Sequence, residues 1–297
     1  MNFQLNSSLI SYSDGSSSIN FGALSGLEYV SDGGSNEFIV LCDYGANRLI
    51  KFDMNFNFIK SVSVASPSWI TSSSDSIYVN SNHKPIIRYN FNLTQTGQID
   101  CTKVCGSSAC CFYTSVFYRK DTNQLYLAEQ TLKKVYSSDS RLTTLTETAS
   151  FSSITVDTCG LTYFNGRIFV GSANNQIITI QDGSLTQTPY NNICAASDSY
   201  IASIYVYKMK YILVNCNLDK KVTILNLDLS YTGYYLSTPS AYGRSFGITF
   251  DGKRLLVTTY QSSSINIFTS TTTTTPTTTT TATTTVNRKF IIKNIFE

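Results

Sequence analysis

Cysteines are the residues of this 297-residue chain whose chemistry is easiest to specify. Their even number, eight, suits a set of disulfide bonds in a secreted or surface protein. A structural zinc site would instead need closely spaced Cys pairs with matching Cys or His, and the only histidine, His83, lies well away from the Cys-rich segment 101–111. We therefore favour disulfides. The candidates are Cys101, Cys105, Cys110, Cys111, Cys159 and Cys194.

Groups suited to catalysis are sparse. A single histidine cannot form a multi-His metal site, and His83 lies in a polar turn, where we interpret it as a solvated loop residue. Glu28, Asp43 and Glu129 lie in or at the end of apolar runs, and we interpret them as surface or turn carboxylates. The chain has no Gly-rich phosphate loop and no Gly-x-Ser-x-Gly motif. We predict no catalytic residue, cofactor or metal; if a metal is bound, we expect Glu28 to hold it.

The elements that would position these groups are β-strands. Four short apolar or alternating runs occupy residues 26–30, 38–41, 48–53 and 58–62. The run 38–41 is continuously apolar, as in a strand covered on both faces, whereas 48–52 mixes polar and apolar positions. We expect one four-stranded antiparallel sheet, which needs similar sheets on each side to cover its faces.

Such sheets recur along the chain. A small residue followed by an apolar one begins each of six units, and each marker precedes two further apolar runs. The markers are Gly26-Leu27, Ser68-Trp69, Ser115-Val116, Gly160-Leu161, Ser203-Ile204 and Gly247-Ile248. A period in the low to middle forties with this content predicts an all-β fold, a six-bladed β-propeller of four-stranded antiparallel blades.

The markers also predict what lines the central channel. The first strand of each blade faces the channel, where blades converge and a small residue relieves crowding. Glu28 is then the only acidic residue near these positions. Cys111, Cys159 and Cys194 fall at or just before the markers of adjacent blades, so a bridge from Cys159 to either neighbour is geometrically possible. Cys42 and Cys216 follow second strands, and we interpret both as buried free thiols.

The two ends of the chain have different predicted roles. The sixth unit lacks a fourth strand, and an exposed strand edge invites aggregation. We expect residues 5–12, or failing that 19–21, to supply this strand and close the ring. The propeller then occupies residues 1–268, and residues 269–285 form a disordered Thr-rich linker or stalk. The role of the short segment 286–297 is open.

Composition narrows the partners and the location. The net charge of +3 is small and the basic residues are scattered, so nucleic-acid binding is not indicated. No apolar run approaches the roughly 20 residues of a membrane span. Residues 1–20 do not read as a signal peptide, which alone favours a cytoplasmic protein. The cysteines, the Thr-rich tract and sequons at Asn6 and Asn92 favour an extracellular or cell-surface glycoprotein instead.

One family resemblance supports the fold. Residues 25–29 and 38–53 combine a Gly-apolar start, an apolar strand ending in Asp43, an Asn47-Arg48 pair and a Phe52-Asp53 close. This pattern resembles an NHL repeat, and residues 246–258 are similar to the same family and to YncE-like propellers. The resemblance covers residues 25–268 and is clearest in the first, fourth and sixth units.

The resemblance implies two classes of function. NHL propellers are interaction platforms and extracellular sensor domains, which implies a non-enzymatic, monomeric module that presents one rim to a protein or glycan ligand. Peptide-amidating relatives hold zinc through several histidines, which this chain lacks. Gluconolactonase-like relatives hold calcium in the channel through acidic and Asn side chains, so a calcium-dependent lactonase or esterase using Glu28 is the alternative.

Overall fold

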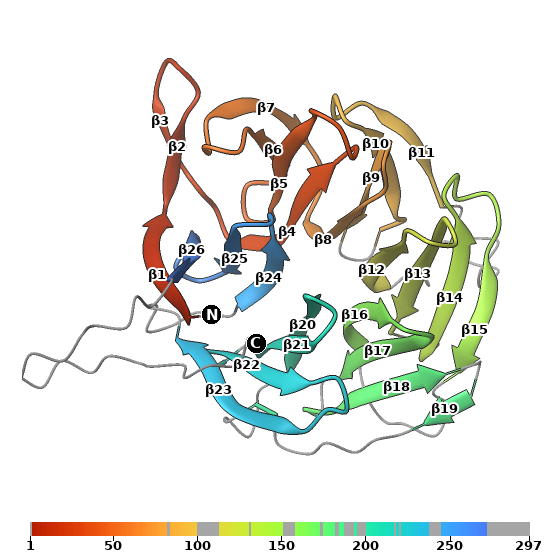
Figure 1. Ribbon diagram of the computed structural model, residues 1–297. Coiled ribbons are helices and arrows are strands. Elements are labelled where there is room, and N and C mark those ends of the chain that lie inside the picture. The colour runs from red at the N-terminus through yellow and green to blue at the C-terminus, as the bar shows by residue number, and fades with distance from the viewer. Residues whose placement is uncertain are drawn as a thin grey trace, which may run out of the picture.

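The computed structural model is a ring of six four-stranded antiparallel sheets (Figure 1), which confirms the predicted all-β, six-bladed propeller. It describes residues 2–81, 84–99, 113–130, 132–150, 158–172, 175–181, 184–186, 193–194, 200–216, 218–219, 221–237 and 245–271. The Thr-rich segment beyond Thr271 and residues 286–297 lie outside this part of the chain. Over the described residues, there is no helix with the length and apolar character that crossing a membrane would require.

The first three blades follow the chain in order. Blade 1 comprises β4 (Leu24–Ser31), β5 (Glu37–Asp43), β6 (Arg48–Phe52) and β7 (Phe58–Ser63). Blade 2 comprises β8 (Pro67–Ser72), β9 (Ser76–Ser81), β10 (Ile87–Asn90) and β11 (Gln95–Gln98). Blade 3 comprises β12 (Tyr113–Arg119), β13 (Gln124–Glu129), β14 (Lys134–Asp139) and β15 (Thr146–Ser150).

The second half of the ring repeats this order until its last strand. Blade 4 comprises β16 (Thr158–Phe164), β17 (Arg167–Ser172), β18 (Ile177–Gln181) and β19 (Ser184–Thr186). Blade 5 comprises β20 (Ile201–Tyr207), β21 (Tyr211–Cys216), β22 (Lys221–Asn226) and β23 (Tyr231–Ser237). Blade 6 comprises β24 (Ser245–Phe250), β25 (Arg254–Thr259), β26 (Ser264–Thr271) and, from the other end of the chain, β1 (Asn2–Leu9).

The ring is closed by the N-terminal strand, as the missing fourth strand of the sixth unit predicts. β1 pairs antiparallel with β26, with Asn2 opposite Thr271 and Leu9 opposite Ile265. The strand ends three residues earlier than expected, because the chain then turns into a small hairpin of β2 (Ser11–Ser13) and β3 (Ser18–Asn20). In this hairpin Tyr12 stacks on Phe58, 5.1 Å between ring centroids, so the hairpin is packed against blade 1.

The core is divided among the blade interfaces. Each of the six interfaces between neighbouring blades holds a cluster of buried apolar side chains, drawn from the continuously apolar second strands and from the strands on either side. Every blade is therefore covered on both faces, which explains why runs such as Ile39-Val40-Leu41 contain no polar position.

The first strands of the blades converge at the centre of the ring, and glycine permits their close approach. β4 lies against both β8 and β24. A Cβ atom added at Gly247 would lie 2.8 Å from Leu27 N and Ser25 O, and one added at Gly26 would lie 2.7 Å from Ser68 O. Real Cβ atoms do not approach backbone this closely, so the predicted role of these small residues in relieving crowding is confirmed at both positions.

A channel cavity as the candidate binding site

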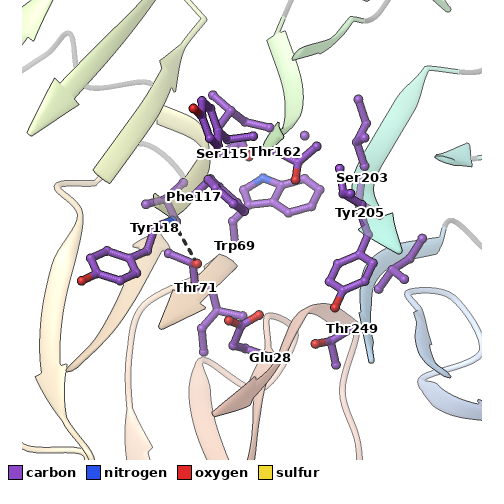
Figure 2. Close-up of a pocket in the computed structure, with 18 of the residues that line it drawn as sticks. Glu28, Trp69, Thr71, Ser115, Phe117, Tyr118, Thr162, Ser203, Tyr205 and Thr249 are labelled. Carbon is purple, nitrogen blue, oxygen red and sulfur yellow. Dashed lines mark hydrogen bonds between the residues drawn. The ribbon is translucent and has the colours of Figure 1, made fainter. Parts of the chain in front are cut away.

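The channel at the centre of the ring contains a cavity of about 630 Å³, lined by residues from the first strands of all six blades (Figure 2). Side chains at alternate positions of a strand share a face, so residues two apart on these strands both face the channel, about 7 Å apart along it. The cavity also reaches Arg119 at the end of β12, Lys120 and Asp121 in the turn that follows, and Met209 in the β20–β21 turn. We call the turns that follow the first strands the hairpin rim.

The inner level of the channel holds the predicted marker residues, with one exception. In five blades the apolar marker residue pairs with the corresponding residue of the second strand, as in Leu27 with Leu41. In blade 2 the residue in that register is Ile70, paired with Val79, so Trp69 takes the small-residue position and Ser68 does not line the cavity. The prediction for Ser68 is therefore wrong. The inner level comprises Gly26, Trp69, Ser115, Gly160, Ser203 and Gly247.

Trp69 places a large side chain at the inner level, where the other five blades have small residues. Five small residues leave open space at the inner level, and the indole of Trp69 extends into that space toward Thr162 (Figure 2). Trp69 is also the only tryptophan in the chain. The cavity thus contains one indole ring, which is also a built-in fluorescent reporter.

The mouth level, two residues closer to the hairpin rim, alternates between small and large side chains. Blades 2, 4 and 6 contribute threonine, and blades 1, 3 and 5 contribute a carboxylate and two aromatic rings. The six residues are Glu28, Thr71, Phe117, Thr162, Tyr205 and Thr249. The alternation leaves room in the channel for the three large groups to extend inward.

Two of the threonines also connect neighbouring blades. Thr71 Oγ1 accepts a hydrogen bond from Tyr118 N of blade 3 at 3.2 Å, and Thr249 Oγ1 accepts one from Tyr29 N of blade 1 at 3.2 Å (the former is dashed in Figure 2). These bonds supply acceptors for backbone N–H groups where adjacent first strands are not paired by a sheet ladder. These two threonines therefore stabilise the contacts between blades, whereas the large residues of the mouth level face the cavity.

Glu28 is the chemically distinctive residue of the mouth level. Its Oε1 accepts hydrogen bonds from Ser72 N at 3.2 Å and Ser72 Oγ at 3.0 Å, and no described residue donates to Oε2. Desolvation in the channel raises the pKa of Glu28 to about 7, an effect that the Ser72 hydrogen bond and the charge of Lys120 reduce. The carboxyl group is held by one oxygen and presents the other to the cavity.

The remaining charged side chains of the lining lie at the rim. Arg119 Nε donates to Asp121 Oδ1 at 2.7 Å and its Nη2 donates to Oδ2 at 2.8 Å, while the guanidinium carbon lies 4.0 Å from the centre of the Tyr163 ring. Arg119 is therefore held on the wall and paired. Lys120 is exposed, and Met209 is 75% exposed at the tip of its turn.

The other predicted carboxylates lie away from the cavity. Asp43 and Glu129 are both fully buried, so the surface interpretation is wrong for them and the turn interpretation is confirmed. Asp43 accepts bonds from Arg48 Nε at 2.9 Å and Nη2 at 2.7 Å and from Gly22 N at 3.2 Å, and Glu129 accepts from Leu132 N. Both carboxylates cap the turn that follows a second strand.

The cysteines differ from the prediction at one point. Cys194 is disulfide-bonded to Cys216, so the prediction of a free thiol at Cys216 is wrong. Since β21 runs antiparallel to β20, Cys216 ends β21 opposite Ile201 at the start of β20, close to the segment that contains Cys194. The bridge therefore joins the end of β21 to the segment that precedes blade 5, where the backbone of Cys194 is also hydrogen-bonded to Asn175 in the β17–β18 turn of blade 4. Cys42 is a free, buried thiol as predicted, and burial raises its pKa.

Residues Cys101, Cys105, Cys110, Cys111 and His83 lie outside the described residues, as does the side chain of Cys159. Asn6 and Asn92 are both exposed. One group of described residues has the composition of a metal site: Cys194, Cys216 and Asp219, with ligand atoms within 4.8 Å of one another. Its two sulfur atoms are bonded to each other, so they are not available as thiolate ligands.

Comparison with known proteins shows the fold alone. No family model and no curated protein matches the chain, so the resemblance to NHL and YncE-like propellers stays a prediction. Virginiamycin B lyase from Staphylococcus aureus superimposes with a TM-score of 0.62 at 14% identity, covering 86% of this chain and 84% of the lyase. A catalytically inactive histidine-to-alanine variant of that lyase, with quinupristin, gives 0.61 at 15% identity, covering 86% and 84%.

A third similar structure is the β-propeller domain of Cps50 (Swd1) from Myceliophteria thermophila. It superimposes with a TM-score of 0.60 at 9% identity and covers 91% of this chain and 100% of the domain. The chain is thus a β-propeller that is similar in shape both to a lyase and to a propeller domain of Swd1.

Proposed function

We propose that the chain is a non-enzymatic binding module that presents the hairpin rim and the channel cavity to a protein or glycan ligand. One observation carries the proposal: at its two levels the cavity combines the Trp69 indole, the Phe117 and Tyr205 rings and hydroxyl groups with the Glu28 carboxylate, whose Oε2 accepts no hydrogen bond from the described residues. Aromatic surfaces with a few polar groups are typical of ligand sites. The exposed Met209 at the rim adds apolar area around the mouth.

The composition of the cavity argues against the lyase chemistry of the structural neighbour. That lyase is described in a catalytically inactive form that lacks one histidine, whereas none of the described residues that line the channel cavity here is a histidine. The composition of the cavity also fits the calcium-dependent alternative poorly. Calcium takes six to eight oxygen ligands, usually with several carboxylates, and Glu28 is the only carboxylate of the two channel levels.

The disulfide of blade 5 and the exposed sequons at Asn6 and Asn92 support an extracellular or cell-surface module. A monomer suits a closed ring whose last strand edge is already paired with β1.

The fluorescence of Trp69 tests the proposal directly on the full-length protein. Glycan and peptide libraries are screened for compounds that shift or quench this emission, and hits are repeated with Trp69→Phe by calorimetry. We expect saturable binding that weakens at least fivefold in this variant. Hydrolysis of lactones or esters that stops with chelator and with Glu28→Gln would overturn the proposal and favour the calcium-dependent enzyme.

A further inference from the structure

From the arrangement of the mouth level, we infer that the channel cavity recognises an alkylammonium group of the lysine type on a protein ligand, with Glu28 as the counter-ion and Trp69, Phe117 and Tyr205 as aromatic walls. The inference rests on the proposed binding function and names the ligand chemistry of that site.

The geometry of the mouth level favours a cationic group in the channel. Glu28, Phe117 and Tyr205 come from alternate blades at one level of the channel, separated by the smaller threonines. Figure 2 shows Glu28 and Tyr205 extending into the same open space, with the Trp69 indole beside it. A cation placed there meets one carboxylate and the faces or edges of several aromatic rings, and cations are attracted to aromatic ring faces.

The charged groups around Glu28 also favour a cationic ligand. Arg119 and Asp121 neutralise each other, and no described ion pair joins Lys120 to Glu28. Glu28 Oε1 is occupied by Ser72, whereas Oε2 receives no hydrogen bond from the described residues. A partly desolvated carboxylate with one free oxygen is complementary to a single hydrogen-bonding cation.

Apolar side chains of the cavity lining favour a ligand with an aliphatic stem. Phe164, Val206 and Met209 also line the cavity, and in the chain they follow the mouth-level residues of blades 4 and 5 toward the hairpin rim. A lysine side chain has an aliphatic stem that such residues can cover while its ammonium group reaches a polar partner. A neutral sugar would use the Trp69 surface but would leave the free oxygen of Glu28 without a cation.

Binding should depend on pH. Desolvation raises the pKa of Glu28 to about 7, and an ammonium ion in contact with it would favour the ionised form. Affinity should therefore increase as pH rises from 6 to 8. The other groups that face Glu28 are Lys120 and Tyr205: burial and the Glu28 carboxylate both raise the pKa of Tyr205, and the charge of Lys120 acts in the same sense as a ligand cation.

The test compares two probes that share a four-carbon side-chain stem and differ in the terminal ammonium group, which only the first carries: Nα-acetyl-lysine methylamide and Nα-acetyl-norleucine methylamide. Both are titrated into the full-length protein with Trp69 fluorescence as readout. We expect the lysine probe to bind at least tenfold more tightly than the norleucine probe at pH 8. Glu28→Gln should remove this preference. The matched control, Glu147→Gln, makes the same charge change at an exposed residue of β15 that pairs with Lys134, and it should leave the preference intact.

Replacing Lys120 should change the affinity for the lysine probe in the opposite direction. Because Lys120→Ala removes a positive charge near Glu28, affinity for the lysine probe should increase two- to fivefold. Equal affinity for the two probes, or no loss in Glu28→Gln, would overturn the inference. If uncharged glycans then bind in a Trp69-dependent manner, the binding function stands and only the ligand class is wrong. If no glycan, peptide or probe binds, the proposed function itself fails.

Discussion

The inner and mouth levels of the channel are built from the same six strands, two residues apart, but their residues have different roles. At the inner level, Gly26 and Gly247 are small because neighbouring backbone lies within 3 Å of where a Cβ atom would be. At the mouth level, residue types alternate between threonine and large groups that face open space. The residue types that recur in every blade therefore build the ring. The residues that differ between blades supply the groups that could bind a ligand.

The largest effect on stability is expected when a larger residue is placed at the crowded inner level. Gly247→Ala places a methyl group 2.8 Å from Leu27 N and Ser25 O, and backbone cannot move aside as a flexible side chain can. We expect a loss of about 2–3 kcal/mol in the free energy of unfolding, measured by denaturant titration with circular dichroism. The matched control is Gly97→Ala in β11, where the added Cβ would lie 4.0 Å from Arg88 Cβ. There we expect unchanged or slightly increased stability.

Trp69 tests whether the one large residue of the inner level serves the ring or the cavity. Truncating a fully buried Trp typically costs about 3–5 kcal/mol. Because Trp69 is only partly buried beside the core between blades 2 and 3, we expect Trp69→Ala to cost about 1–2 kcal/mol. Unfolding is followed by circular dichroism, since the variant has no tryptophan. A loss of 4 kcal/mol would show that Trp69 is a core residue and not a wall of the site.

Trp69 also shows which features of the channel can be predicted from the sequence and which cannot. The repeat predicts the number of blades, their strands and the closing strand, because apolar runs and small residues recur in every unit. The pair Ser68-Trp69 has the composition of a marker, so the one-residue register difference of blade 2 becomes visible only when Ile70 is found opposite Val79. The type of residue in a repeat can be predicted more reliably than its register.

The same distinction applies to the site. Glu28 could be singled out from the sequence because it lies two residues after a marker, but its partner Ser72 belongs to the next blade and is found only in the fold. The Cys194–Cys216 bridge does not follow from the positions of the blade markers, because it depends on the antiparallel pairing of β20 and β21, which brings the end of β21 beside the segment before β20. Local patterns predict strands, whereas pairs across strands depend on topology.

Thr249 tests whether the threonines of the mouth level stabilise the contacts between blades. Thr249→Val keeps the shape of the side chain but leaves Tyr29 N without its acceptor, so we expect a loss of about 1–1.5 kcal/mol in unfolding free energy. Thr249→Ser retains the hydroxyl and should recover most of it. Hydrogen exchange of the Tyr29 amide gives a local readout, faster in the valine variant and near wild type in the serine variant.

The smallest effect, and the one most specific to the mouth level, is the pH dependence of stability set by Glu28. Its pKa is about 7 in the folded protein, against an ordinary value of 4.5. The folded state therefore holds its proton more tightly than the unfolded chain, so stability from this group is fully present below pH 4.5 and is lost as pH rises through 7. Because the side chain borders the open cavity, we expect about 1 kcal/mol between pH 5 and pH 8. Glu28→Gln should remove this slope while Glu147→Gln preserves it; an unchanged slope in Glu28→Gln would mean that the carboxyl group is already ionised in the channel.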